Sequence, residues 1–529
     1  MTANEVAHAY VTLVHTWTAS VSPVTSWTWP TLATTWTAST DFGSNRRISL
    51  QNIAGPFLIP GTFTFNPIDR VITYRLATGE SPIVLTTLLA PALGEIVVAA
   101  GSPDAKVESV RMVNLTLAHT AARLEEDCMV DGCSYQSCAD SSGAAMHLHG
   151  AHGWTLEGLE ITSTGQTALW IEDACTDINV SGAWLHDMGA GGVRVGVTAQ
   201  GIVPNASFAL TRGVRLTDSI VEDGGLLCAA GTGILWHNAA DGVIEHNEVT
   251  QLRYTGISVG WTWSYEATST ANVTVRKNYV HDVGLNTLSD LAGIYLVGPQ
   301  PGSLVEGNLV TDVSRGGNGA HCFYIDQACS GTIWRGNVGV GAADSIFQVH
   351  YGMDNRIENN IFAAPGPSSV DTTSAPPWPC AYPLDCGAAG LRSGKHAAGD
   401  GEGAFSAFSF TRNIVALGAD ASAVLFITAV TDGLANMSFA NNTYWRDETA
   451  STLQFPSTQD PTTFEQWQLQ DKDTGSGVDD PMFVNAKARN FTVRAGSPAL
   501  ARGFEQVDTR DVGPRRSVRP NVWRAADMV

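Results

Sequence analysis

A five-residue segment recurs eight times between Ala145 and Val349, and this repetition constrains the fold of the 529-residue chain more than any other feature. Successive copies begin as few as 23 residues apart, and insertions lengthen some of the intervals. A unit this short cannot bury an apolar face by itself, so the copies must stack as coils of a solenoid. The copies are Ala145–His149, Ala168–Glu172, Gly192–Gly196, Gly233–His237, Gly256–Gly260, Gly293–Val297, Cys322–Asp326 and Ser345–Val349.

Two columns of this repeat predict the interior of the solenoid. Successive side chains of a strand point to opposite faces, so the second and fourth residues of every copy share one face. Fifteen of these sixteen residues are apolar, and Gln348 is the exception. The third and fifth residues, which include Tyr295, Tyr324 and Asp326, then point outward. The sequence therefore predicts an all-β fold, a right-handed parallel β-helix.

A second periodic signal, one asparagine per coil, supports the same fold. An asparagine side chain bonds backbone groups and tolerates left-handed backbone geometry, so a regular series predicts a repeated structural corner. The series consists of Asn247, Asn278, Asn308, Asn337, Asn360, Asn413 and Asn442.

The remaining segments lack this pattern. Residues 1–100 contain extended stretches rich in Trp and Thr, which we interpret as an accessory β-rich lead-in. The β-helix is expected over residues 101–514, with an inserted loop at about 363–405, where prolines and small residues gather. We expect residues 480–514 to close the open end of the solenoid and residues 515–529 to form a tail.

Charge and hydropathy argue against two classes of binding partner, nucleic acids and membranes. The formal charge of −21 argues against a nucleic-acid surface, because phosphate binding needs clustered Lys and Arg. No apolar run is long enough to span a membrane, so no membrane partner is expected. We expect a monomer that binds neither nucleic acid nor membrane and needs no cofactor.

Nine cysteines are an odd number for a fully paired secreted protein. Cys175 and Cys228 are isolated in the sequence, whereas the others are close enough to form local bridges. The spacing of the first three falls outside that of zinc ligand pairs, so no metal site is expected. The candidates for bridges are Cys128, Cys133 and Cys138, then Cys322 with Cys329, and Cys380 with Cys386.

Carboxylates on the outer face are the first candidates for catalysis. Among outward positions only Glu172 and Asp326 are acidic, and five coils, about 24 Å, separate them. Glycoside hydrolysis needs two carboxyl groups about 5 to 10 Å apart. Asp290, three residues before Gly293, lies on the coil next to that of Asp326. The two can act as a pair only if the segment 284–291 bends inward.

Aromatic and histidine side chains fall on the same coils as these aspartates, and such crowding is where carboxylate pKa values are driven apart. Aromatic rings along a groove also suit sugars, whose C–H faces pack on aromatic planes. Alternatively, the tryptophans only pack an inserted loop onto the helix, and the histidines are structural. The predicted substrate-binding residues are Trp261, Trp263, Tyr295, Tyr324, His237, His321, His350 and Tyr351.

Six motifs occur together within a family likeness that runs from about residue 60 to Pro514. They are Tyr254–Trp261, Leu288–Tyr295, Gly298–Gly302, Tyr324–Asp326, His350–Asn355 and Asp480–Val484. In combination they resemble the right-handed parallel β-helix proteins of glycoside hydrolase family 141. The resemblance implies a carbohydrate-active enzyme, with α-L-fucosidase and xylanase among the associated activities. It also matches the family's two catalytic aspartates to Asp290 and Asp326.

The chain departs from the family pattern at two positions near these aspartates. Ala292 stands where relatives tend to have glycine, and Gln327 stands where they have glutamate. Glutamine cannot ionise, so any role of that glutamate is lost or altered. Relatives also carry an export signal ahead of this chain's start, whereas its first residues have neither a basic nor an apolar region. We therefore expect an extracellular or secretory-pathway protein with an incomplete N-terminus.

Three functions fit these observations. The first is hydrolysis of a plant or algal cell-wall type polysaccharide, fucosidase-like or xylanase-like, with Asp290 and Asp326 as acid and nucleophile or base in either order. The second is a polysaccharide lyase or uronate epimerase, which needs a base such as Arg194, Arg253 or a tyrosine beside a neutralised uronate. The third is a non-catalytic glycan-binding or surface β-helix, an alternative that the change at Gln327 leaves open.

Overall fold

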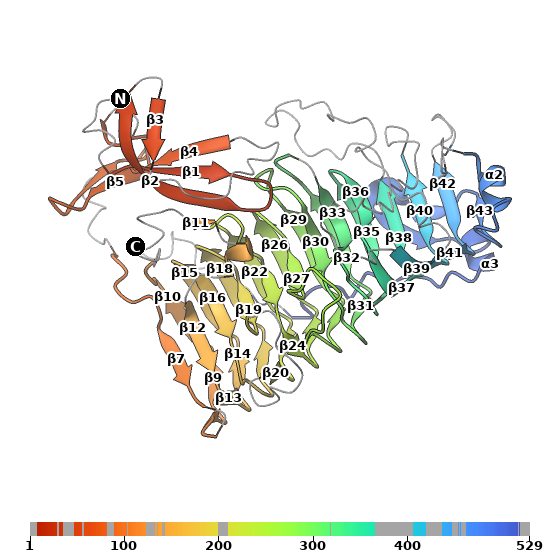
Figure 1. Ribbon diagram of the computed structural model, residues 1–529, viewed down its shortest axis with the longest axis horizontal. Helices are drawn as coiled ribbons and strands as arrows, with labels where there is room; N and C mark the ends of the chain where they lie inside the picture. Colours follow the sequence, from red (N-terminus) through yellow and green to blue (C-terminus); the bar gives the residue numbers. More distant parts are fainter. Residues whose placement is uncertain are drawn as a thin grey trace.

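Three long parallel sheets dominate the computed structural model. It describes residues 8–28, 31–34, 47–55, 58–81, 89–102, 104–122, 133–134, 136–139, 143–198, 210–317, 319–364, 406–418, 436–446, 453, 455, 462–516 and 518. Within these residues the sheets contain nine, eleven and twelve strands and wind around one long axis (Figure 1). This arrangement confirms the predicted parallel β-helix. Most of the predicted inserted loop, and the tail after residue 518, lie outside the described residues.

The nine-stranded sheet contains the predicted repeat. Its register pairs Met146 with Leu169 and Ile257 with Ile294, as the aligned copies require. One strand beyond the eight copies joins the sheet at its N-terminal end. In chain order the strands are β7 (Val97–Ala100), β12 (Ala144–His149), β16 (Thr167–Ile171), β19 (Val193–Val195), β23 (Ile234–Trp236), β27 (Ile257–Val259), β30 (Leu291–Leu296), β33 (Ala320–Ile325) and β36 (Ser345–Val349).

The last copy of the repeat is shifted by one residue from the predicted alignment. In the observed register Phe323 lies beside Phe347, and Tyr324 lies beside Gln348. Phe347 is therefore the inward residue, with its ring centroid 6.3 Å from that of Phe323. The prediction that Gln348 faces the interior was wrong. The shift adds an aromatic ring to the core and removes from it an amide that would have lacked partners there.

Two further sheets complete each coil. The eleven-stranded sheet contains β9 (Arg111–Val113), β14 (Thr155–Glu157), β17 (Asn179–Ser181), β21 (Arg215–Thr217), β25 (Val243–Glu245), β28 (Thr274–Arg276), β31 (Leu304–Glu306), β34 (Ile333–Arg335), β37 (Gly352–Glu358), β39 (Ser406–Thr411) and β41 (Met437–Ala440). The twelve-stranded sheet contains β10 (Thr116–Ala118), β15 (Glu160–Thr164), β18 (Trp184–Met188), β22 (Ile220–Gly224), β26 (Glu248–Leu252), β29 (Tyr279–Val283), β32 (Leu309–Val313), β35 (Val338–Ala342), β38 (Ile361–Ala364), β40 (Ile414–Leu417), β42 (Thr443–Arg446) and β43 (Gly477–Val478).

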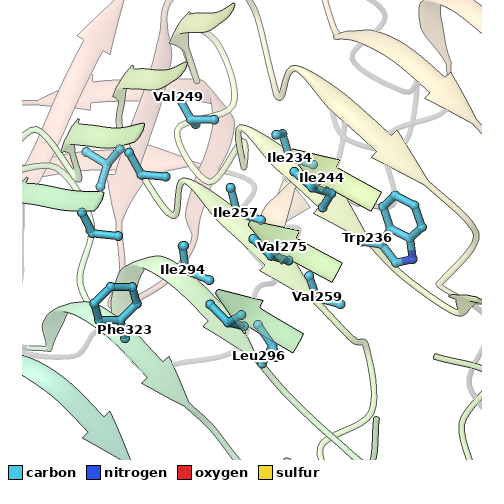
Figure 2. Close-up of a cluster of buried hydrophobic side chains, with 14 of the residues drawn as sticks. Ile234, Trp236, Ile244, Val249, Ile257, Val259, Val275, Ile294, Leu296 and Phe323 are labelled. Atoms are coloured by element: carbon cyan, nitrogen blue, oxygen red, sulfur yellow. The ribbon is translucent and has the colours of Figure 1, made fainter. Parts of the chain in front are cut away.

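Side chains from all three sheets meet in one continuous core. Figure 2 shows Ile257 and Ile294 of the nine-stranded sheet facing Val275 of β28 and Val249 of β26. All four side chains are fully buried or nearly so. Because each coil covers the apolar residues of its neighbours, the core runs along the axis, and the stacked coils determine where the outward side chains lie.

The predicted asparagines form a buried ladder at the corner between the eleven-stranded and twelve-stranded sheets. The Asn278 side-chain oxygen accepts hydrogen bonds from both the backbone and the side-chain nitrogen of Asn247, each 3.0 Å long. Asn308 does the same for Asn278. The left-handed backbone lies one residue earlier than predicted, for example at Lys277, where φ is 55°. The asparagines themselves join the coils.

An antiparallel sheet precedes the β-helix. It consists of β1 (Tyr10–Val14), β2 (Ala19–Thr28), β3 (Thr31–Thr34), β4 (Arg47–Gln51) and β11 (Cys133–Ser134). A separate hairpin pairs β5 (Thr62–Asn66) with β6 (Val71–Arg75). In Figure 1 the red β1–β2 hairpin reaches along one side of the solenoid toward β29. The tip of the accessory sheet thus lies beside the middle coils.

The C-terminal segment covers the open end and then turns back. Helix α2 (Phe464–Gln468) buries Trp467 against Phe439, with ring centroids 5.4 Å apart. The chain continues through β44 (Phe483–Asn485), the 3₁₀ helix η5 (Ala486–Ala488), β45 (Asn490–Val493) and α3 (Pro498–Ala501). Phe491 and Ala499 of these elements already pack against Ile361 on the flank of the twelve-stranded sheet.

Ion pairs fasten this returning segment to the coils. Lys277 contacts Asp511 at 2.9 Å, and Arg515 contacts Asp218 at 2.6 Å. The prediction that residues 480–514 close the open end was therefore wrong for most of this segment, which packs along the flank. Charged residues near the C-terminus find partners of opposite charge on the coils instead.

One disulfide joins distant parts of the described chain. Cys138, in the 3₁₀ helix η3 (Gln136–Cys138), is bonded to Cys228, 90 residues away in sequence. Cys322 and Cys329 are free and buried, so the predicted local bridge between them was wrong. Closeness in sequence is a poor guide to disulfide pairs in this fold, because the coils bring cysteines that are distant in sequence together. Cys128, Cys380 and Cys386 lie outside the described residues.

Three two-stranded pairings complete the described elements. Besides β44 with β45, they are β8 (Val107–Glu108) with β13 (Ala151–His152), and β20 (Thr211–Arg212) with β24 (Ala239–Ala240). Among the described residues, no helix has the length and apolar character needed to cross a membrane.

Candidate active site

A row of polar side chains follows the outer face of the nine-stranded sheet. The register places Tyr295 of β30 beside Tyr324 of β33, and Tyr324 beside Gln348 of β36. All three side chains are more than nine-tenths buried although they point away from the core. The two tyrosine rings meet edge to face, with centroids 5.2 Å apart. The outer face of the sheet therefore carries a layer of buried polar side chains across β30, β33 and β36.

Asp326 lies directly after β33 and is held at both carboxylate oxygens. The Tyr295 hydroxyl donates to Oδ2, and His350 Nδ1 is 2.9 Å from Oδ1. The Trp263 indole in turn donates to the Tyr295 hydroxyl at 3.2 Å. Three predicted site residues thus fix the position of the fourth, Asp326.

Asp290 stands at the start of β30, at the end of a sharply bent segment. Leu285, Asn286 and Asp290 all have left-handed backbones, with φ of 41°, 52° and 53°. The Tyr254 hydroxyl donates to the Asp290 carbonyl at 3.2 Å. On the next coil Gly319 has φ +70°, and a Cβ there would lie 3.0 Å from the Asp290 Cα, so this contact requires glycine. Segment 284–291 is therefore sharply turned, and the pairing of Asp290 with Asp326 stays a prediction.

The negative charges of both aspartates affect the pKa values of the same three tyrosines. Burial raises the pKa values of Tyr254, Tyr295 and Tyr324 well above the ordinary range, and the negative charges of Asp290 and Asp326 raise each further. Tyr324 also shares a hydrogen bond with Asp326. The three hydroxyls therefore remain protonated donors at neutral pH.

These shifts predict a loss of stability in strong alkali. A group whose pKa is higher in the folded protein stabilises the fold below its unfolded pKa, and this contribution disappears as the pH rises through the folded value. Burial also raises the pKa of Tyr444, beside Asp473. We expect these four of the 11 tyrosines to ionise only on unfolding, and the free energy of unfolding to fall above about pH 10. Ultraviolet titration of native and urea-unfolded protein checks this, and reversible ionisation of all 11 in the native state would contradict it.

The other predicted residues surround this group at different distances. His321 shares a 2.6 Å hydrogen bond with Ser345 and its ring meets that of Tyr324 edge to face. The Tyr351 ring lies against His350, with centroids 5.0 Å apart. These two residues therefore lie in the shell around Asp326.

His237 and Trp261 lie farther along the solenoid. Their rings are 4.6 Å apart, and His237 follows β23, three strands from Asp326, or about 14 Å. Burial and the nearby charge of Arg194 lower the pKa of His237 well below its ordinary value. His237 is a neutral, buried imidazole that does not reach Asp326.

Sequence reasoning missed Tyr254 and Gln348. The Gln348 side-chain oxygen is buried and has no hydrogen-bond partner within the described part of the chain. Gln348 was the one polar residue in the predicted interior columns, and that exception was the available signal for the one-residue shift. Tyr254 gave no comparable signal, because its contact is with a loop on the next coil. In the described ranges no group of three or more His, Cys, Asp and Glu side chains is arranged to hold a metal ion.

Comparison with known proteins identifies the class of fold. Residues 200–375 match a family described as right handed beta helix region. A solved structure titled "Glycoside hydrolase" superposes with a TM-score of 0.57, at 20% identity over 69% of each chain. At this identity the likeness shows the fold: this is a right-handed parallel β-helix protein.

Two more distant structures share only parts of the arrangement. One is titled "The complex structure of XylC with xylose" (TM-score 0.37, 13% identity, 72% of this chain and 54% of that one). The other is the A-module of a mannuronan C-5 epimerase from Azotobacter vinelandii (TM-score 0.37, 12% identity, 71% and 91%). Neither carries an argument about function. Comparison with curated protein sequences gave no match.

Proposed function

We propose that this protein is a glycoside hydrolase that acts on a plant or algal cell-wall type polysaccharide, fucosidase-like or xylanase-like. Asp290 and Asp326 are its two catalytic carboxylates. The observation that carries the proposal is geometric: Tyr295 and His350 contact the two oxygens of Asp326, and Asp290 directly precedes the neighbouring strand β30, where the Tyr254 hydroxyl donates to its carbonyl. Two carboxyl groups in one polar, partly desolvated site are the requirement for acid and nucleophile or base chemistry at a glycosidic bond.

Hydrogen bonding favours the role of nucleophile or base for Asp326. The Tyr295 hydroxyl and His350 Nδ1 contact the two oxygens of Asp326, which suits a carboxylate that works as an ionised acceptor. Each oxygen keeps a further lone pair for attack on a sugar carbon or for a proton of water. Asp326 is therefore the nucleophile or base in this proposal, and Asp290 is the acid that protonates the leaving oxygen.

The same contacts weigh against a lyase or epimerase. Such enzymes need a side chain that removes a proton from the sugar ring. The three tyrosines have raised pKa values, which makes them poor bases. Arg194 lies over the Trp170 ring at 4.0 Å, and Arg253 donates to the Gly224 carbonyl at 2.9 Å. Both arginines named as candidate bases are thus engaged elsewhere.

A glycan panel tests the proposal. Wild-type protein and Asp326→Asn are incubated with fucosylated xyloglucan, glucuronoxylan, fucoidan, pectin and alginate, and the products are scored for reducing ends and for unsaturated uronates. We expect reducing ends from at least one substrate, and a rate about 1,000-fold lower for Asp326→Asn. The control Asp354→Asn changes an exposed aspartate on the nearby β37 and should leave the rate unchanged. Unsaturated uronates would indicate a lyase, and no product from the whole panel would overturn the proposal.

A further inference from the structure

The tip of the β1–β2 hairpin contacts the segment that carries Asp290. The Ser289 backbone N–H donates to the Thr16 carbonyl at 2.7 Å, and the Arg47 guanidinium of β4 donates to the Thr287 carbonyl. Trp17 and Asp290 each directly follow one of the two hydrogen-bonded residues, Thr16 and Ser289. The accessory sheet therefore places a tryptophan at the edge of the candidate active site.

This hairpin tip is held firmly in place. The His15 N–H donates to the Thr18 carbonyl at 2.9 Å, which closes the turn, and the His15 ring is 2.6 Å from the Ser20 hydroxyl. The antiparallel sheet is also joined to the β-helix, because β11 pairs with β2 and the Cys138–Cys228 disulfide follows shortly after β11. A ligand that binds at the tip would therefore have little loop entropy to overcome.

Trp17 itself is exposed although its surroundings are ordered. Its side chain is 39% exposed, whereas His15 in the same turn is 6% exposed. Removing the apolar face of an indole from water is favourable, and a sugar ring can cover such a face with its C–H groups. A solvent-facing indole on a hydrogen-bonded turn, one residue from the contact with Ser289, has the properties of a sugar-stacking platform.

We propose that the β1–β2 hairpin is part of the glycan-binding site and that Trp17 stacks on a sugar unit on the Asp290 side of the cleavage point. This inference rests on the proposed function and extends it. The accessory sheet then has two roles: its backbone supports the segment before Asp290, and its tip enlarges the binding site beyond the β-helix.

Calorimetric titration of the Asp326→Asn protein separates binding from turnover. The probes are xylohexaose, a fucosylated xyloglucan nonasaccharide and a mannuronate hexamer. We expect Trp17→Ala to weaken binding of the recognised oligosaccharide about tenfold, and Trp17→Phe to weaken it less than about threefold, because phenylalanine keeps an aromatic face. The control Phe63→Ala removes a more exposed ring from β5 and should not change the affinity.

Hydrogen exchange of residues 284–291 distinguishes stacking from mere support. Exchange should be unchanged in Trp17→Ala, since the Thr16 to Ser289 bond is between backbone groups. Weaker binding together with faster exchange would mean that Trp17 only holds the segment, and would overturn its role in stacking. Equal affinities of the Trp17→Ala and parent proteins would overturn this inference alone. No binding of any probe to the parent would overturn the proposed function as well.

Discussion

Asp290→Asn should slow hydrolysis of the polysaccharide about 1,000-fold while slowing hydrolysis of a 4-nitrophenyl glycoside far less. An acid is needed to protonate a sugar leaving group, whose conjugate base is strong, whereas 4-nitrophenolate leaves without protonation. Asp326→Asn should slow both substrates alike, because every substrate needs the nucleophile or base. The measurement is kcat/KM for both substrates with wild type and the two variants.

The prediction depends on the contacts of Asp326, whose two oxygens are contacted by Tyr295 and His350. Asp290 lies directly before the neighbouring strand, where the Tyr254 hydroxyl donates to its carbonyl. Asp354→Asn serves again as the control for a lost surface charge. If Asp326→Asn spared the aryl glycoside and Asp290→Asn did not, the two roles would be reversed, and equal losses in all cases would remove the assignment of an acid altogether.

The fold was predictable because it depends on a repeated local pattern. Residues such as Met146, Leu169 and Ile257 occupy equivalent positions in every coil, and a shift of one residue would expose them all. The asparagine series adds a second, independent period. Both signals are visible in a single sequence because every coil needs apolar residues facing the core and an asparagine at the same corner.

The candidate site was only partly predictable from the same pattern. The outward column placed Asp326 and Tyr295 correctly on one face, and their hydrogen bond follows from that placement. The position of Gln348 did not follow, because the last copy contains two apolar residues, Ile346 and Phe347, that compete for the same inward position. Periodicity cannot decide between two apolar neighbours, and only packing against Phe323 does.

Contacts outside the repeat could not be predicted at all. The hydrogen bond from Ser289 to Thr16 joins a bent segment to a hairpin more than 250 residues earlier, and the Cys138–Cys228 disulfide bridges 90 residues. Such contacts depend on the docking of one unit on another. These contacts leave no periodic pattern in the sequence, although they determine which residues surround Asp290.

Asn308→Ala should destabilise the protein by about 3 to 5 kcal/mol, more than most single substitutions. The Asn308 oxygen accepts from the backbone and side-chain nitrogens of Asn278, and its amide group donates to Val275 and Asn337. Alanine would leave a buried backbone N–H of Asn278 and the carbonyl of Val275 without these partners. Each buried group left unpaired costs about 1 to 3 kcal/mol.

Urea unfolding followed by tryptophan fluorescence measures this loss. The matched control is Asn272→Ala, which removes an exposed asparagine whose side chain makes a 3.1 Å bond to Asp241. That change should cost about 1 kcal/mol, because its groups can bond water instead. Equal effects of the two substitutions would mean that the ladder does not hold the coils together. The register that places Tyr295, Tyr324 and Gln348 side by side would then depend on the apolar core alone.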